Sequence, residues 1–249
     1  MTVKEIFDFL NEKFPVETAC DFDNPGILVG DPNREVSKAI VALDCTPEVI
    51  KTAQKGGCQL IITHHPIIFE PLKKVLADSL VYKLIKSGIS VISMHTNLDV
   101  GVGGVNDALC AALMLKNVQK VEAGDGYLLN SGLLSPVLSA DELALYIKER
   151  LGGAVKYVGC DKKIEKVLVC SGSGGSYLQD AVRLGCGALI TADVKHNVFL
   201  DAERLNIALF DAGHFDTEDV ITEPLKSLLE QNISTVEFTV CHLSSIKSV

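Results

Sequence analysis

Short apolar runs alternate along the chain with segments in which apolar residues recur at helical spacing. The β-branched runs are typical of buried strands, and the longer periodic segments are typical of helices that cover a sheet. The strands are predicted at residues 38–43, 60–63 and 89–94, and the helices at residues 47–55 and 78–86. Residues 102–115 begin glycine-rich and are then predicted to turn helical. This rhythm predicts an α/β fold in which helices cover mainly parallel sheets.

The second half of the chain repeats the pattern of the first. In both halves an apolar strand, a turn, a helix and a second apolar strand ending in Thr follow one another, and the matching stretches are residues 39–63 and 166–191. The next strand of each half is followed by a His with an acid four positions later, His95 with Asp99 and His214 with Glu218. We interpret this as a duplication. Chance similarity between two βαβ units is the alternative.

A turn-rich segment at residues 121–127 separates the two halves. Its Gly and Asp residues are typical of a turn or a linker. The sequence therefore predicts two similar α/β lobes, each a mainly parallel sheet with covering helices, at residues 1–124 and 125–249.

The sharpest local motif is Thr63-His64-His65-Pro66, which directly follows an apolar strand. Within a strand two adjacent side chains point to opposite faces, but Pro66 removes a ladder donor and ends the strand. Beyond the strand end both rings can turn into the crevice where α/β sheets place their ligands. The alternative is one buried and one exposed structural histidine.

The two His-x-x-x-acid motifs have alternative explanations as well, an ordinary turn around Asp99 and a helix start around Glu218. Taken together with His64 and His65, however, they predict one shared metal site. Imidazole and carboxylate ligands without thiolate favour Zn²⁺, Mn²⁺ or Fe²⁺. Five ligands exceed the needs of one open catalytic ion, so we expect two ions per chain, held by His64, His65, Asp99, His214 and Glu218.

Further candidates surround these ligands. His95 is predicted to lie beside the metals and to move protons, and His196 is a second candidate for proton transfer. Asp193 and Lys195 could orient a substrate, or they could lie in a solvated loop. The glycine-rich segment 171–175 could bind an anion through its backbone N–H groups, or it could be only a tight turn.

Composition narrows the possible partners. The net charge of −9 makes nucleic acid an unlikely partner, because phosphate binding depends on Lys and Arg. No apolar run reaches membrane-spanning length, and the N-terminal residues lack the layout of a signal peptide, so we expect a cytoplasmic protein. The eight cysteines form no Cys-x-x-Cys motif and are expected to be reduced and mostly buried.

The motifs, taken in order, resemble the Nif-three-like family, whose bacterial members are often labelled GTP cyclohydrolase I type 2 homologues. The matching stretches include the Asp23-Asn24-Pro-Gly26 segment, Thr63–Pro66, residues 94–99, residues 191–196 and residues 211–218. Ala192 departs from the glycine expected in this family. The resemblance implies a two-lobed α/β fold, a dinuclear metal centre on the five ligands given above, and a homohexamer of two stacked trimers.

Two functions are compatible with these observations. The first is a metal-dependent hydrolase of a small molecule, to which the family label adds GTP ring opening as a hint. The second is a metal-binding ring assembly or adaptor without catalysis, which interacts with a protein or a nucleic acid. A substrate screen on metal-loaded protein discriminates between them.

Overall fold

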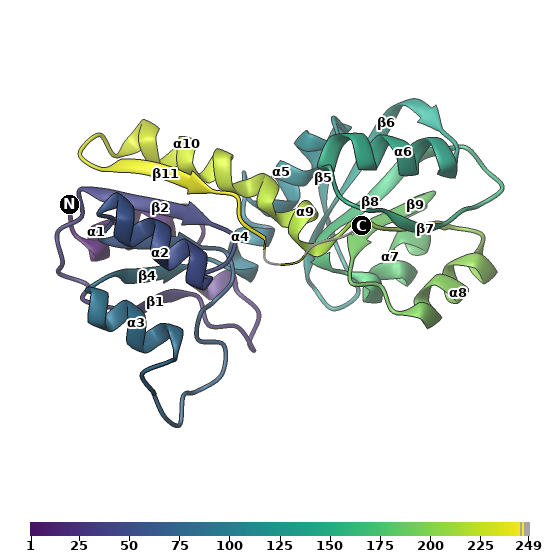
Figure 1. The fold of residues 1–249 in the computed structure, drawn as a ribbon. Helices are drawn as coiled ribbons and strands as arrows, with labels where there is room; N and C mark the ends of the chain where they lie inside the picture. The colour runs from purple at the N-terminus through teal and green to yellow at the C-terminus, as the bar shows by residue number, and fades with distance from the viewer. Residues whose placement is uncertain (245, 247–249) are drawn as a thin grey trace. The chain divides into compact units, whose positions relative to one another are not determined.

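The computed structural model describes residues 1–244 and residue 246. The chain forms two compact units, each built around its own sheet. The first consists of Met1–Gly104 and the segment that begins at Thr222, and the second is built on Val105–Ile221. Figure 1 shows the elements of both units along the chain.

The first unit holds a five-stranded sheet in the order β1-β4-β3-β2-β11. Four neighbouring strands are parallel, and only β1 runs antiparallel, against β4. Its strands are β1 (Gly26–Val29), β2 (Lys38–Ala42), β3 (Leu60–Thr63), β4 (Ser90–Ser93) and β11 (Glu237–Cys241). Its helices are α1 (Val3–Lys13), η1 (Val16–Thr18), α2 (Pro47–Gly56), α3 (Leu80–Ser87), α4 (Thr96–Val100) and α10 (Thr222–Asn232).

Local sequence signals explain where the helices of the first unit begin and end. The Thr46 hydroxyl accepts a hydrogen bond from the Val49 N–H at the start of α2, and Gly57 ends the helix with a φ of 68°. Helix α3 begins after Ser79 and ends before Gly88 in the same way. The predicted helices at residues 47–55 and 78–86 and the predicted strands of this half are thereby confirmed.

The core of the first unit follows from the alternation of side chains along its strands. Ile40, Ile61 and Val91 share one face of the sheet and are buried against α2 and α3. Helix α10 packs against β11 and β2, and Figure 1 shows it running alongside β11. Strand β11, near the end of the chain, therefore belongs to the same sheet as β1, β2, β3 and β4.

The second unit holds a six-stranded sheet in the order β5-β6-β8-β9-β10-β7. The three central strands β8, β9 and β10 are parallel, and β5, β6 and β7 pair antiparallel. Its strands are β5 (Lys116–Glu122), β6 (Leu128–Leu138), β7 (Lys156–Val158), β8 (Ile164–Ser173), β9 (Ala188–Ala192) and β10 (Ala208–Asp211). Its helices are α5 (Val105–Ala112), α6 (Ala140–Leu151), η2 (Gly175–Tyr177), α7 (Leu178–Arg183), α8 (His196–Leu205), α9 (His214–Glu218) and η3 (Asp219–Ile221).

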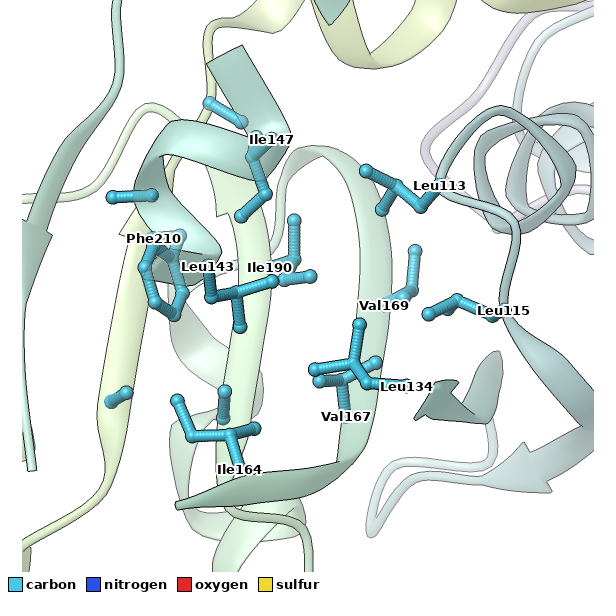
Figure 2. Packing of buried hydrophobic residues seen from close by; sticks show 14 of the residues in the cluster. Leu113, Leu115, Leu134, Leu143, Ile147, Ile164, Val167, Val169, Ile190 and Phe210 are labelled. Atoms are coloured by element: carbon cyan, nitrogen blue, oxygen red, sulfur yellow. The ribbon is translucent and has the colours of Figure 1, made fainter. Parts of the chain in front are cut away.

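One hydrophobic cluster of this unit is made of aliphatic side chains together with Cys110 and Phe210. Val167, Val169 and Ile190 from the central strands pack against Leu143 and Ile147 of α6. Figure 2 shows these side chains interleaved between helix and sheet. Full burial of such side chains contributes roughly 1.5–3 kcal/mol each.

The two units share a core of three parallel strands joined by helices, as the sequence repeat predicts. Strands β2, β3 and β4 correspond in order to β8, β9 and β10, and a short helix follows the last strand of each set. The predicted α/β fold with two lobes is confirmed. The second sheet is more mixed than predicted, because the β5–β6 hairpin and β7 add three antiparallel pairings.

The compact units differ from the division into residues 1–124 and 125–249 expected from the sequence. The turn-rich segment is not a linker but the turn of the β5–β6 hairpin, where the Ala123 N–H donates to the Tyr127 carbonyl at 2.9 Å. The chain instead passes between the units at Gly104 and again at Ile221. Among the described residues, no helix has the length and apolar character needed to cross a lipid bilayer.

Candidate metal centre

In the first unit, His64 and His65 follow directly on β3 and turn to the same end of the sheet. Their ring centroids lie 4.9 Å apart, and the rings are tilted by 44°. The turn is fixed by its backbone: the His65 N–H donates to the Leu43 carbonyl (3.1 Å), and the Thr63 hydroxyl donates to the His65 carbonyl (2.9 Å). The end of the strand therefore frees both rings from the alternation that would separate them.

His95 and Asp99 join this pair at the end of β4. One nitrogen each of His64, His65 and His95 can be chosen so that the three atoms lie within 4.8 Å of one another. The Asp99 carboxylate, buried in α4, lies 3.6 Å from His64 Nε2. The structure thus brings His65, His95 and Asp99, the other predicted side chains of this half, close to His64, and it places His95 among the candidate ligands.

Each of these histidines is held through its Nδ1 atom by an oxygen that accepts a hydrogen bond. A backbone carbonyl and an ionised carboxylate have no proton to give, so Nδ1 carries the hydrogen and Nε2 carries the lone pair. The acceptors are Met94 O for His64 (2.9 Å), Asp44 Oδ1 for His65 (2.7 Å) and Asp23 Oδ1 for His95 (2.7 Å). Metal-binding histidines are typically oriented in this way.

Asp23 is the most strongly held of these acceptors. Its side chain is fully buried, and it accepts hydrogen bonds from the His95 ring, from the Thr96 N–H (2.9 Å) and from the Thr96 hydroxyl (2.5 Å). Burial by itself would raise the pKa of Asp23, but the hydrogen bonds from His95 and Thr96 outweigh it and lower the pKa to about 2. Asp23 therefore stays ionised and fixes the ring of His95.

The second unit holds a separate pair of donors on α9. His214 is the first residue of this helix and Glu218 the last, so the i,i+4 spacing brings His214 Nε2 to 3.0 Å from a carboxylate oxygen of Glu218. The Nδ1 atom of His214 lies 2.6 Å from Asp193 Oδ2. Glu218 first, and Asp193 in addition, raise the pKa of His214 to about 9 despite its partial burial. With this raised pKa, His214 carries a second ring proton at neutral pH. A metal ion that binds His214 must displace that proton.

Gly172, near the end of β8, makes room for this pair. Its φ of +57° is in the left-handed region, and a Cβ atom there would lie 2.1 Å from Glu218 Oε1 and 3.3 Å from His214 Cε1. Three backbone N–H groups at the end of β8 and in the turn after it already donate to side chains, namely Ser171 to Asn106 (2.8 Å), Gly172 to Thr217 (3.1 Å) and Gly174 to Thr191 (2.8 Å). These bonds favour a tight turn over an anion-binding loop for residues 171–175.

His196 is not part of either donor group in the described contacts. It is exposed at the first residue of α8. Its predicted role in proton transfer stays a prediction, as does the assignment of the five ligands.

Sequence reasoning missed the role of three carboxylates, Asp23, Asp44 and Asp193, that orient the rings. Asp44 is the second residue after β2, Asp193 directly follows β9, and Asp23 stands shortly before β1. The signal available for the first two is the one used for the histidines, a polar side chain just past the end of a parallel strand. Asp193 was expected to orient a substrate or to be solvated, and the structure shows it on the ring of His214.

The donor atoms suit a metal ion. Within the described residues, imidazole nitrogens and carboxylate oxygens converge without a cysteine sulfur among them, which fits borderline divalent ions such as Zn²⁺, Mn²⁺ or Fe²⁺. The absence of a Cβ at Gly172 preserves the space that Glu218 occupies. The structure therefore contains a candidate metal-binding group.

Comparison with known proteins assigns the chain to a family. A model of the Duf34/NIF3 family (NGG1p interacting factor 3) matches residues 1–248. The chain belongs to this family. Relatives include proteins named GTP cyclohydrolase 1 type 2 homolog from Clostridium acetobutylicum, 36% identical over 88% of this chain and 85% of the relative. The homolog of the same name from Clostridium perfringens is 34% identical over 96% of both chains.

Several solved structures share the fold of this chain. The Staphylococcus aureus hypothetical protein SA1388 superposes with a TM-score of 0.91 at 29% identity, covering 100% of this chain and 99% of that one. Reduced HcgD from Methanocaldococcus jannaschii superposes with a TM-score of 0.82 at 29% identity, covering 96% and 97%. A Bacillus cereus protein related to NIF3, at 22% identity, supports the fold alone with a TM-score of 0.92 over 100% of this chain and 99% of that one.

Proposed function

We propose that this Duf34/NIF3 protein is a metal-dependent hydrolase of a small molecule. In this proposal two divalent ions are held by the donors predicted from the sequence: His64, His65, Asp99, His214 and Glu218. One observation carries the proposal. In each unit, every histidine of the donor group has its Nδ1 held by an oxygen acceptor, so that Nε2 is the atom available to a metal.

Two divalent ions supply Lewis acidity, which polarises a substrate oxygen and makes water a better nucleophile at neutral pH. The residues of the chain orient the ligands and handle the protons. Asp44, Asp23 and Asp193 fix the planes of three imidazoles. His95, whose Nδ1 proton is held by Asp23, can exchange a proton at Nε2 with a substrate, and His196 is the second candidate for that task.

The name of the relatives supplies a first substrate to test. The two Clostridium relatives are named GTP cyclohydrolase 1 type 2 homologs, so GTP is the first compound and other purine nucleotides follow. Opening a purine ring by water needs the same activated nucleophile as other amide-type hydrolyses.

Metal analysis by mass spectrometry of freshly purified protein tests the proposal. We expect two ions per chain, and we expect His65→Ala to lose metal and turnover together. His242→Ala is the matched control, because His242 is partly exposed in the same unit and pairs with Glu223 at 3.3 Å, outside the donor group. Unchanged turnover by His65→Ala protein freed of metal would contradict the proposal. Full metal occupancy with no turnover across a broad substrate screen would instead favour the metal-binding assembly without catalysis.

The assembly and location implied at the sequence level remain proposals. A homohexamer would give a mass in light scattering of six times the 26.8 kDa of one chain. A smaller mass at working concentration would contradict it. Fractionation of cells tests the cytoplasmic location.

A further inference from the structure

Two exposed phenylalanines lie next to the histidines of the first unit. The chain has nine phenylalanines, and all of them lie in the described part of the chain. Seven are buried or half-buried, whereas Phe22 is 66% and Phe69 is 45% exposed. These two contact each other, with ring centroids 6.2 Å apart and an interplanar angle of 43°. The exposed rings are therefore paired rather than scattered over the surface.

The pair continues the row of histidine rings. The centroid of Phe69 lies 6.1 Å from that of His95, edge to face at 82°, and His95 lies 5.1 Å from His64. Four rings thus follow one another from the donor group outward, with the two exposed ones at the outer end. The two exposed rings therefore stand at the outer end of a row of rings that leads to the histidines of the donor group.

The network that orients His95 also holds both phenylalanines in place. Phe22 stands in a turn closed by the Asp23 N–H, which donates to the Cys20 carbonyl at 2.9 Å. The Cys20 N–H in turn donates to the Thr96 hydroxyl at 2.9 Å. Because Asp23 also binds His95 and Thr96, the position of Phe22 is tied to that of the imidazole.

Asn24, the residue after Asp23, holds the loop that carries Phe69. The Asn24 side chain donates to the Ile68 carbonyl at 2.7 Å and so anchors the loop directly before Phe69. Both rings are therefore preorganised, and a ligand that stacks on them does not have to order a flexible loop first.

We propose that Phe22 and Phe69 form a stacking platform for the planar heteroaromatic ring of the substrate, beside His95. This inference rests on the proposed function and makes it more specific. Aromatic faces bind planar heterocycles by stacking and tolerate different ring substituents. Aliphatic side chains offer apolar area without such a face, so the platform selects ring-containing substrates over sugar phosphates that lack a ring of this kind.

Calorimetric titration of the metal-loaded protein with two probes tests the platform. The probes are guanosine 5′-monophosphate, which carries a planar base, and ribose 5-phosphate, which carries the same sugar phosphate without it. We expect Phe22→Leu and Phe69→Leu each to weaken binding of the nucleotide by about tenfold, because stacking of one base is worth that much or more. Binding of ribose 5-phosphate and the metal content are expected to stay unchanged.

Two further variants separate ring stacking from apolar area. Phe69→Tyr keeps an aromatic face and is expected to bind the nucleotide like the native protein. Leu72→Ala removes an apolar side chain that is 49% exposed in the same loop, and it is expected to leave nucleotide binding unchanged. If Leu72→Ala weakens binding as much as Phe69→Leu does, general apolar contact explains the result and the platform is rejected.

Three other outcomes would also overturn the inference. The first is a native protein that binds the nucleotide no better than ribose 5-phosphate, and the second is leucine variants that bind it as tightly as the native protein. The third is a change of mass in light scattering for the double leucine variant, which would make the pair a contact between copies of the chain. Absence of metal or of turnover in the native protein bears on the proposed function instead, because the titration needs no hydrolysis.

Discussion

At the scale of single residues, Gly172 decides whether Glu218 and His214 can approach each other. A Cβ atom there would meet Glu218 Oε1 at 2.1 Å, so we expect Gly172→Ala to displace the carboxylate and to lower metal occupancy. Gly185→Ala is the matched control, because Gly185 has a similar φ of +67° and no atom within 4 Å of the added Cβ. In both variants the left-handed backbone at the alanine lowers the free energy of unfolding by about 1 kcal/mol. Mass spectrometry for metal and thermal melting would separate the two effects, and equal metal content in both variants would disprove the role of Gly172.

Asp23 acts on the donor group through a neighbouring ring. Asp23→Asn keeps the size of the side chain but removes the charge that holds the Nδ1 proton of His95. Because His95 is the proton-transfer residue of the proposed function and not one of its five ligands, we expect turnover to fall by about 100-fold or more. Metal affinity, measured by competition with a chelator, is expected to change little, and Asp31→Asn, in an exposed turn, is the control. Native turnover in Asp23→Asn would show that the hold of Asp23 on His95 does not matter for proton transfer.

The sequence alone singled out the candidate histidines and acids. It did not reveal which residues accept hydrogen bonds from the histidine Nδ1 atoms. His64, His65 and Asp99 carry their chemistry in the residue type and stand directly after apolar strands, so their position followed from the parallel sheet. Asp23 and Asp44 are ordinary turn residues in the sequence. Their role depends on the packing of β1 and β2 segments beside β4 and β3, which local patterns do not encode.

At the scale of elements, capping residues fix helix boundaries better than periodicity does. Thr46 and Gly57 bound α2 within one residue of the predicted range, since a cap satisfies particular backbone groups. The hairpin of β5 and β6 was not predicted, because its turn has the same Gly and Asp content as a linker. Its identity depends on the pairing of Val121 with Leu129, which lies outside the turn itself.

The capping box of α6 predicts a pH-dependent contribution to stability. Glu142 accepts a hydrogen bond from Lys163 and from the Ser139 N–H, and these bonds lower its pKa to about 2, from 4.5 without them. A lowered pKa in the folded state adds stability that is present above pH 4.5 and is lost as the pH falls toward 2. We therefore expect Glu142→Gln to lower the melting temperature at pH 7.

The difference between Glu142→Gln and the native protein should shrink as the pH drops below about 4.5. Melting curves between pH 7 and pH 3 measure it. Glu149→Gln, exposed in the same helix, controls for the loss of one negative charge. A difference that is constant over this range would mean that the cap does not depend on ionised Glu142.

At the scale of the whole molecule, the repeat in the sequence predicted the two sheets but not which segments complete them. The repeated part is the set of three parallel strands, and each set carries its own hydrophobic pattern. The elements added to it are different in the two units: β11 returns from the end of the chain to pair with β2, whereas β5 and β6 extend the second sheet. Pairing between strands that are far apart in the chain leaves no periodic pattern in the local sequence. The sequence therefore offered no sign that the boundary between the units does not lie near residue 124.

The observed division makes a prediction about fragments of the chain. Residues 105–221 contain a complete sheet and two hydrophobic clusters of the described residues, so we expect this fragment to fold alone with a cooperative thermal transition. The comparison is the fragment 125–249, which corresponds to the lobe expected from the sequence. It lacks α5 and β5, which removes Leu109, Leu113 and Leu115 from the core, and it carries β11 without its partner β2.

Truncation of one buried leucine lowers the free energy of unfolding by about 2 kcal/mol or more, so the loss of three lowers it by about 6 kcal/mol or more. This loss is comparable to the whole stability of a domain. The fragment 125–249 is therefore expected to lack a cooperative transition and to aggregate through the unpaired edge of β11. Calorimetry and heteronuclear NMR spectra of both fragments measure the difference. Cooperative folding of 125–249 together with failure of 105–221 would show that the boundary lies in the hairpin after all, and that β11 does not need β2 to complete its sheet.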